Sequence, residues 1–441
     1  MLHVAVSTAL GLAFLLTTSL SRAQHARPED APARGGNEPS RDEKGKEKRR
    51  TDVTVVPYGG ADSDIGVGAG VIASIARLTG EHEPYLWRIE STSLVTFQTD
   101  PKDATVRTGE SPSVQFPYID TYLLLSLPHA VKNRLGLDFR ISYTRELALK
   151  YYGMGNAAEV PENVELGDPR YEYAREHPTF RMRSESRLIG GTVLILGAAY
   201  THNWITVPPG TLLAEDLESG DPRVQKALGP TTDHGVVELT YGAGWDDRDN
   251  RVSATSGMYH TAQIDLAPGG TPAFPHRWAR VNVSLRTYVP IVRRRFTLAW
   301  RAVGDLLLGD PPFYELPRAL DTSAIGGAKG VRGVPAQRYH GKVKVFGNLE
   351  LRSRIFDFSL LGQKNSFGAV AFVDAGRLWS DYPPDPELDG ELTWRDGFGL
   401  KPGIGGGLRV YGGTSFVVRA DVAWSPDARP IGAYLGGGEA F

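Results

Sequence analysis

From residue 51 onward, apolar and polar side chains alternate with a period of two. In residues 343–355 one face carries Val343, Val345, Leu349, Leu351 and Ile355, and the other carries Lys344, Asn348, Glu350, Arg352 and Arg354. Residues 85–98, 280–289 and 416–424 alternate in the same way. Because successive side chains of a β-strand point to opposite faces, this pattern predicts strands with one apolar and one polar face.

Sixteen segments fit this pattern and are predicted to be strands. They are residues 52–58, 64–77, 84–98, 114–127, 134–150, 171–188, 190–206, 234–246, 257–267, 276–290, 295–308, 342–357, 366–379, 398–412, 415–426 and 432–441. Short connections mostly alternate with longer ones, and the longest are residues 207–233 and 309–341. An even number of strands with this alternation is typical of an outer-membrane β-barrel.

A soluble sandwich of two sheets would also produce alternating faces, with the apolar face buried. Two features favour a membrane barrel instead. Several polar faces carry more than one charge within a single strand, which suits a wet lumen. Aromatic residues also stand near the strand ends, as in an interfacial girdle; they are Tyr85, Trp87, Trp300, Trp379 and Trp424.

The composition narrows the class of protein further. A net charge of −2 gives no indication of a nucleic-acid partner. The absence of cysteine excludes a disulfide framework and a thiolate metal site, and no cofactor is expected. After residue 20 no run of about 18 apolar residues occurs, so no later helical membrane span is predicted.

The N-terminal region is expected to export the chain. Residues 4–20 are apolar and are followed by Ser21-Arg22-Ala23, which predicts a signal peptide over residues 1–23. An uncleaved anchor is the alternative, because no Lys or Arg precedes the apolar run. Residues 24–50 lack large apolar side chains and are predicted to form a disordered, charged linker. The basic run 44–50 could touch anionic headgroups, although a solvated tail is favoured.

The segment 309–340 lacks the period of a strand or a helix and carries Gly326, Gly327, Gly330 and Gly333. A loop of this length inside a β-rich chain is either functional or disordered. Its glycines, with Arg332 among them, favour a folded loop whose backbone closely approaches another part of the protein.

Several motifs, in this order along residues 51–441, resemble the BamA/TamA-type outer-membrane assembly superfamily, or bacterial surface antigen family. The loop carries Pro311-Pro312-Phe313-Tyr314, Ile325-Gly326-Gly327 and Val331-Arg332-Gly333. The two following strands carry Asn348-Leu349-Glu350-Leu351-Arg352 and Phe372-Val373-Asp374-Ala375-Gly376. An earlier turn runs from Asp246-Asp247-Arg248-Asp249-Asn250 to Gly257, and the chain ends in a Gly-rich hairpin, from Gly403 to Trp424, and Phe441.

The resemblance implies a sixteen-stranded transmembrane barrel over residues 51–441, with a long loop between strands 11 and 12 inserted in the lumen. It also implies that Arg332 meets Asp374 on the inner wall and that Gly376 leaves room for the loop. Alternatively, Arg332 is a solvated loop charge and Asp374 has other partners. Residues 24–50 are too few for the POTRA domains that precede the barrel in assembly factors, so a barrel-only member is expected. Val334 stands where the family usually has an aromatic residue.

The first and last predicted strands are expected to pair weakly. Pro57 has no N–H to donate to a sheet, and the last strand is rich in glycine, including Gly436 and Gly438. In the family this seam is the proposed lateral gate, and we expect it to open to lipid here. The alternative is that Pro57 lies beyond the paired part of its strand.

Two other kinds of site are weighed against this interpretation. His202 beside Asn203 and His234 beside Asp233 could belong to a barrel hydrolase, but no nucleophile motif accompanies them, so no enzyme is predicted. The acidic turn at Asp246–Asp249 lacks the residue order of a calcium loop and contains Arg248, so a turn network is favoured over a cation site.

The sequence therefore predicts an integral protein of the outer membrane of a Gram-negative bacterium that moves polypeptide or lipid into or across that membrane. A passive pore for small polar solutes and a structural surface-antigen barrel remain alternatives. The expected partners are outer-membrane lipid and lipopolysaccharide, with unfolded client proteins or periplasmic accessory proteins. The lumen charges are mixed and predict no ion preference; they are Lys344, Glu350, Arg352, Arg354, Arg419 and Asp421.

Overall fold

The computed structural model describes residues 50–79, 82–97, 116–131, 135–160, 168–229, 233–292, 295–320, 322–360, 363–394, 397–412, 416–427 and 431–441. The expected signal peptide lies outside these residues, as does all of the expected linker except its last residue. Both remain predictions.

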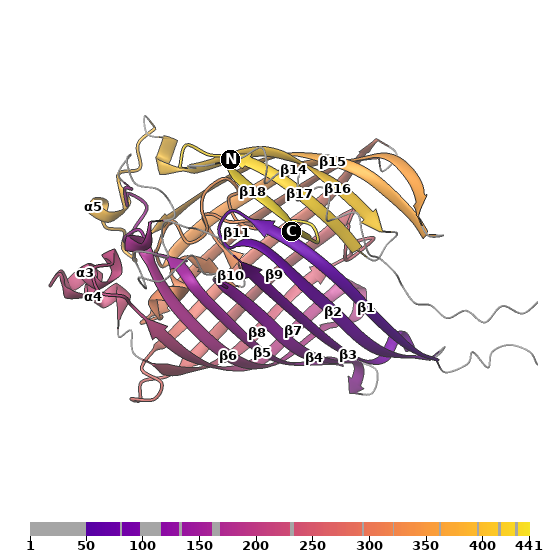
Figure 1. The fold of residues 1–441 in the computed structure, drawn as a ribbon, viewed down its shortest axis with the longest axis horizontal. Coiled ribbons are helices and arrows are strands. Elements are labelled where there is room, and N and C mark those ends of the chain that lie inside the picture. Colours follow the sequence, from indigo (N-terminus) through magenta and orange to yellow (C-terminus); the bar gives the residue numbers. More distant parts are fainter. Residues whose placement is uncertain are drawn as a thin grey trace, which may run out of the picture.

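Sixteen antiparallel strands form a closed barrel (Figure 1). They are β1 (Arg50–Asp62), β2 (Gly66–Thr79), β3 (His82–Phe97), β4 (Tyr118–Val131), β5 (Leu135–Lys150), β6 (Glu172–Arg187), β7 (Thr192–Thr206), β8 (His234–Asp246), β9 (Gly257–Pro268), β10 (Arg277–Val292), β11 (Phe296–Gly309), β14 (Val343–Leu360), β15 (Gln363–Trp379), β16 (Lys401–Gly412), β17 (Phe416–Trp424) and β18 (Gly432–Gly437). Each strand pairs with its neighbours in chain order, and β1 closes the ring against β18. The predicted sixteen-stranded antiparallel barrel is confirmed.

The connections contain short elements that the strand pattern did not predict. They are the helices α3 (Leu212–Glu218), α4 (Pro222–Leu228) and α5 (Pro386–Asp389), the two-residue strands β12 (Arg318–Ala319) and β13 (Thr322–Ser323), and 3₁₀ turns at Pro169–Tyr171, Ile189–Gly191, Phe313–Glu315 and Gly397–Gly399. The side chain of Thr211 caps α3 by accepting a hydrogen bond from the N–H of Ala214. None of the helices in the described part of the chain is long and apolar enough to cross a membrane.

The two faces of the strands differ as the alternation predicts. Outward-facing Val345, Leu349 and Val373 are about half exposed, at 51%, 47% and 50%. Their inward-facing neighbours Lys344 and Asp374 are fully buried although they are charged. An apolar outer surface and a polar interior suit a barrel that contacts lipid on the outside.

The long connections gather at one end of the barrel, where Figure 1 shows α3, α4 and α5 together. An apolar cluster joins these connections to the inner wall: Leu149, Tyr151, Met154, Tyr173, Leu213, Leu228, Val236, Ala267, Trp278, Leu307, Phe313, Tyr314 and Leu316. Most of its aromatic rings are almost completely buried. This cluster packs across the lumen at the end that carries the long loops.

The ring is weakest where its ends meet. β1 pairs with β2 along its whole length, from Arg50↔Leu78 to Asp62↔Gly66. Against β18, β1 makes two register pairs, Ala61↔Leu435 and Asp62↔Tyr434. One more backbone bond runs from the N–H of Ser63 to the carbonyl oxygen of Ala433, at 3.0 Å. The seam between β1 and β18 is therefore far shorter than its neighbour.

Candidate functional site

The candidate site is the loop between β11 and β14, residues 310–342, together with the inner wall that it contacts. Ala324, Ile325, Val331 and Val334 of the loop are buried in a cluster with Val303, Phe346 and Leu378, which face inward from β11, β14 and β15. Because these strand residues alternate with outward-facing neighbours, the loop packs on the lumen side of the wall.

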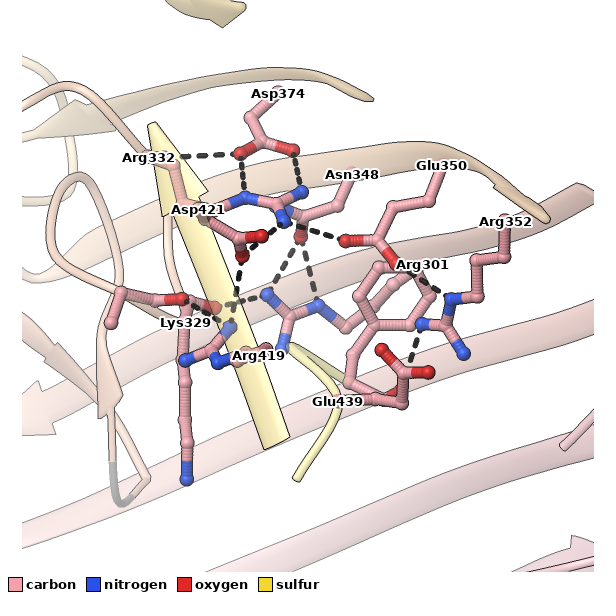
Figure 2. A network of polar contacts seen from close by, with 12 residues as sticks. Arg301, Lys329, Arg332, Asn348, Glu350, Arg352, Asp374, Arg419, Asp421 and Glu439 are labelled. Atoms are coloured by element: carbon pink, nitrogen blue, oxygen red, sulfur yellow. Dashed lines mark hydrogen bonds and ion pairs between the residues drawn. The ribbon is translucent and has the colours of Figure 1, made fainter. Parts of the chain in front are cut away.

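Arg332, at the centre of this loop, is completely buried among three carboxylates (Figure 2). Its Nε and Nη2 donate to the two oxygens of Asp374 at 2.7 and 3.0 Å, and its backbone N–H donates to the same group at 3.1 Å. Its Nη1 donates to Glu350 at 2.6 Å and lies 3.5 Å from Asp421. The guanidinium also lies 3.4 Å from the ring centre of Phe372. A planar fork that meets a carboxylate in this way makes strong, charge-assisted hydrogen bonds.

The three carboxylates differ in how much they depend on Arg332. Glu350 also pairs with Arg352 at 2.7 Å, and Asp421 also pairs with Arg409. The ion pairs of Asp374, within the described residues, are with Arg332 alone. Buried charges are tolerated when each is paired, so Asp374 is the group that most requires the loop.

Wall side chains also hold the backbone of the loop. Arg419 donates to the carbonyl oxygen of Ala328 at 3.1 Å, and Asn348 donates to that of Gly330 at 2.8 Å. Arg301 donates to the carbonyl oxygen of Lys329 and to the amide oxygen of Asn348 (Figure 2). The Asn348, Glu350 and Arg352 positions of the predicted motif thus all lie on the wall that contacts the loop or its partners.

Glycines allow the close approach of loop and wall. A Cβ at Gly376 would lie 2.4 Å from Ile325 Cδ1 and 2.7 Å from Phe346 Cβ. Gly333 has a φ of +92°, a conformation that side chains disfavour. Gly326 and Gly327 also have positive φ values. The structure therefore places Gly326, Gly327, Val331, Arg332 and Gly333 beside Asp374 and Gly376, as the resemblance implies.

The loop also contacts the last strand, and the sequence motifs did not predict this contact. The N–H of Gly333 donates to the hydroxyl of Tyr434 at 3.1 Å. Tyr434 is the β18 residue whose register partner on β1 is Asp62. One hydrogen bond therefore links the buried loop directly to the seam.

The predicted turn motif lies apart from these contacts, at the short-turn end. Asp247 accepts from the N–H of Met258 at 2.6 Å, and Asn250 accepts from that of Val252 at 2.7 Å. Arg248 donates to Asp246 at 2.8 Å. Gly257 has a φ of +95°, and a Cβ there would lie 2.5 Å from the carbonyl oxygen of Asp247. These carboxylates and amides close the turn on itself.

The terminal positions depart from the prediction. Pro57 is paired with Val71 of β2 and lies outside the stretch of β1 that pairs with β18. Gly436 lies on β18 opposite Arg419, but the strand ends at Gly437 rather than at residue 441. At Gly438, with a φ of +81°, the chain turns away from the strand.

Phe441 consequently lies off the strand and packs against Ala254, Tyr288 and Ala299 on the inner side of the barrel. The guanidinium groups of Arg301 and Arg352 lie 5.1 and 4.9 Å from its ring. The prediction of an aromatic terminus carried by the last strand was wrong in this respect, because a glycine with a left-handed backbone ends the strand early.

The residues considered for a hydrolase form structural contacts instead. His234 is buried and lies 2.9 Å from the hydroxyl of Tyr314. The amide oxygen of Asn203 accepts from Nε and Nη2 of Arg175, at 2.9 and 2.7 Å. The first contact holds the loop at Tyr314 to β8, and the second joins β6 to β7.

A closed antiparallel barrel with an apolar outer surface, and an inner loop held to the wall through Arg332, define a class of outer-membrane barrel. The family model for the Omp85 superfamily domain matches residues 194–441. The chain belongs to the Omp85 superfamily. The Omp85 barrel fold implies an integral protein of the outer membrane of Gram-negative bacteria, and no POTRA domain occurs within the described residues.

Solved structures are similar to this chain at low sequence identity. BamA from Haemophilus ducreyi lacking POTRA domains 1–3 is 13% identical, with a TM-score of 0.53 over 89% of this chain and 71% of that one. CdiB from Escherichia coli is 12% identical, with a TM-score of 0.49 over 88% of this chain and 67% of that one. A comparison with curated proteins finds no match.

Proposed function

We propose that this barrel moves polypeptide or lipid into or across the outer membrane through a lateral opening between β1 and β18. The observation that carries the proposal is the short seam. Its two register pairs compare with six between β17 and β18, from Val418↔Gly437 to Ala423↔Gly432, and thirteen between β1 and β2.

The energetic consequence follows from the number of hydrogen bonds. Each backbone bond contributes about 0.5–1.5 kcal/mol net. The β1–β18 seam, with two pairs and the Ser63–Ala433 bond, therefore has less backbone hydrogen bonding to lose than the other strand pairs of the ring. Parting these strands costs less than parting any other pair in the ring, since every other pair is longer.

The filling of the lumen supports a lateral route over a passive pore. Solute flow would require a continuous aqueous path. Phe313, Tyr314 and Leu316 pack in the apolar cluster at the long-loop end, and the segment around Arg332 fills the space beside β14, β15 and β17. A substrate that enters the seam from the membrane does not have to pass along the whole lumen.

Lipid of the outer membrane, including lipopolysaccharide, would then border the seam, and an unfolded client protein would be the polypeptide cargo. Periplasmic accessory proteins are further expected partners. The buried loop would set how readily the seam opens, because the bond from Gly333 to Tyr434 ties it to β18.

The test uses the purified protein in liposomes, with an unfolded barrel protein added outside. Client folding is compared with empty vesicles, and ion conductance is recorded for the same preparation. We expect faster client folding and little steady conductance. Steady conductance that grows when residues 326–338 are deleted, without client folding, would establish the passive pore instead. A folded barrel with neither signal would contradict autonomous transport and leave a structural role.

A further inference from the structure

A cavity of about 480 Å³ lies inside the barrel, toward the end with the short turns. Its walls come from the turn at Arg248–Ala254, from β9 and β10, from the C-terminal residues Gly438–Phe441 and from four loop residues, Ala319, Leu320, Thr322 and Lys329. Its volume falls within the range of ligand pockets, about 300–1,000 Å³. Neither the seam nor the contacts of Arg332 uses this cavity.

The lining is strongly cationic. Six basic side chains border the cavity: Arg183, Arg248, Arg251, Arg286, Arg301 and Lys329. Glu439 is the one acidic side chain among its lining residues in the described part of the chain, and it already pairs with Arg409 at 3.0 Å. Basic side chains therefore outnumber acidic ones in the lining of this cavity.

Within the described residues, few carboxylates pair with these arginines: Glu185 lies 3.8 Å from Arg183. Asp246 forms ion pairs with three arginines: Arg248 at 2.8 Å, Arg251 at 3.7 Å and Arg187. Arg301 is buried, and its hydrogen bonds go to the neutral oxygens of Asn348 and Lys329. Such buried charge without a counter-ion is costly unless something else supplies one.

Arg286 is the lining residue that most clearly lacks an anionic partner among the described residues. It faces inward from β10 and makes no hydrogen bond or ion pair with any residue that the structure describes, and its Nε is buried without an acceptor. The ring of Tyr259 lies 5.4 Å from its guanidinium. Ser284, two residues earlier on the same face, also has a buried hydroxyl without a partner. A guanidinium and a hydroxyl donor thus face the same space.

We propose that this cavity binds a phosphate-bearing anion, either a small free phosphate compound or the headgroup of a phosphorylated lipid. Guanidinium groups match the geometry of phosphate oxygens and bind them through two parallel hydrogen bonds. A doubly charged phosphate would neutralise Arg286 and Arg301 together, and the hydroxyl of Ser284 would donate to a third oxygen. Binding at this site does not depend on the seam or on transport.

The experiment measures binding calorimetrically with the full chain in nanodiscs. One arm adds inorganic pyrophosphate to nanodiscs of phosphatidylcholine. The other compares nanodiscs containing phosphatidic acid with pure phosphatidylcholine, scored by retention of phosphatidic acid on the purified protein. The test variant is Arg286→Gln, and the hydroxyl is tested separately with Ser284→Ala.

The matched control is Arg140→Gln. Arg140 also faces inward, has a buried Nε without an acceptor and lies 4.0 Å from the ring of Tyr122, but it does not line the cavity. Folding of every variant is checked by heat-modifiable migration on a gel, so a binding defect is separated from a folding defect.

We expect Arg286→Gln to weaken binding about tenfold or more, because it removes a charge-assisted contact, and Ser284→Ala to weaken it a few-fold. Arg140→Gln should leave binding nearly unchanged. Pyrophosphate binding would identify a free compound, whereas retention of phosphatidic acid alone would identify a lipid headgroup. No binding in either arm, or an equal loss in Arg286→Gln and Arg140→Gln, would overturn the proposal.

Discussion

Replacing Arg332 with methionine should destabilise the buried loop strongly, for a reason that the surrounding carboxylates make specific. Methionine fills similar space but donates nothing. Glu350 keeps Arg352 at 2.7 Å, and Asp421 keeps Arg409. In the variant, Asp374 would retain only the hydrogen bond from the backbone N–H of residue 332, which is 3.1 Å long in the unchanged protein. One carboxylate is left buried without a cation.

The magnitude follows from that single unpaired group. Removing one partner of a buried ion pair costs about 3–5 kcal/mol. Asp374→Asn should cost less, about 1–2 kcal/mol, because Arg332 still reaches Glu350 at 2.6 Å. The double variant Arg332→Met/Asp374→Asn should be more stable than Arg332→Met alone, since no buried charge remains unpaired.

The assay is urea unfolding of the refolded barrel in vesicles, combined with protease cleavage within residues 322–340. Arg354→Met is the control. Arg354 faces inward on β14, and its contacts are Ser253 Oγ at 3.2 Å and the ring of Tyr411, so its loss leaves no carboxylate unpaired. A double variant at least as unstable as the sum of the two single variants would refute this reasoning, as would a protected loop in Arg332→Met.

Two further predictions concern the packing of the same loop against Gly376 and the protonation of His340 within it. Gly376→Ala should destabilise the barrel by about 1–3 kcal/mol and expose the loop to protease, because the new methyl group would lie 2.7 Å from Phe346 Cβ. The control Gly304→Ala, where a Cβ would meet nothing within 4 Å, should be neutral, and equal effects would argue against close packing. Burial, with the charges of Arg338 and Lys344, lowers the pKa of His340 to about 3. An unfolded histidine titrates near about 6.5, so stability is fully present above that pH and should be lost as pH falls toward 3. His340→Phe should flatten the fall in the urea midpoint between pH 7 and pH 5; an unchanged slope would show that other groups cause it.

The period-two alternation predicted most of the fold, because a barrel wall between lipid and a polar interior imposes that pattern on every strand. The predicted strand 234–246 has the same bounds as β8, and the other fifteen differ at their ends by a few residues. The strand end at Gly437 was missed because it depends on the backbone conformation of Gly438, which residue type alone does not determine. The helices of residues 212–228 were missed because two turns of helix are too short for a clear period.

The contact between Arg332 and Asp374 was predictable from the sequence, but the wider network of contacts around it was not. The resemblance pointed to Arg332 and Asp374, whereas Asp421 and Tyr434 contact the loop from strands more than 80 residues after it. The cationic cavity was not predictable either. Arg286 alternates along β10 like any lumen residue, and only the folding of the turn at Arg251 and of the loop at Lys329 brings these charges around the same cavity.

The lateral route can be tested most directly by locking the seam. The chain has no cysteine, so Ala61→Cys/Leu435→Cys introduces a single disulfide between register partners on β1 and β18. Ala262→Cys/Val283→Cys places the matched bond between β9 and β10. We predict that oxidising the first pair abolishes client or lipid transfer in liposomes, that reduction restores it, and that the second pair has no effect. Full transfer through a barrel whose seam is shown to be cross-linked would contradict a lateral opening between β1 and β18.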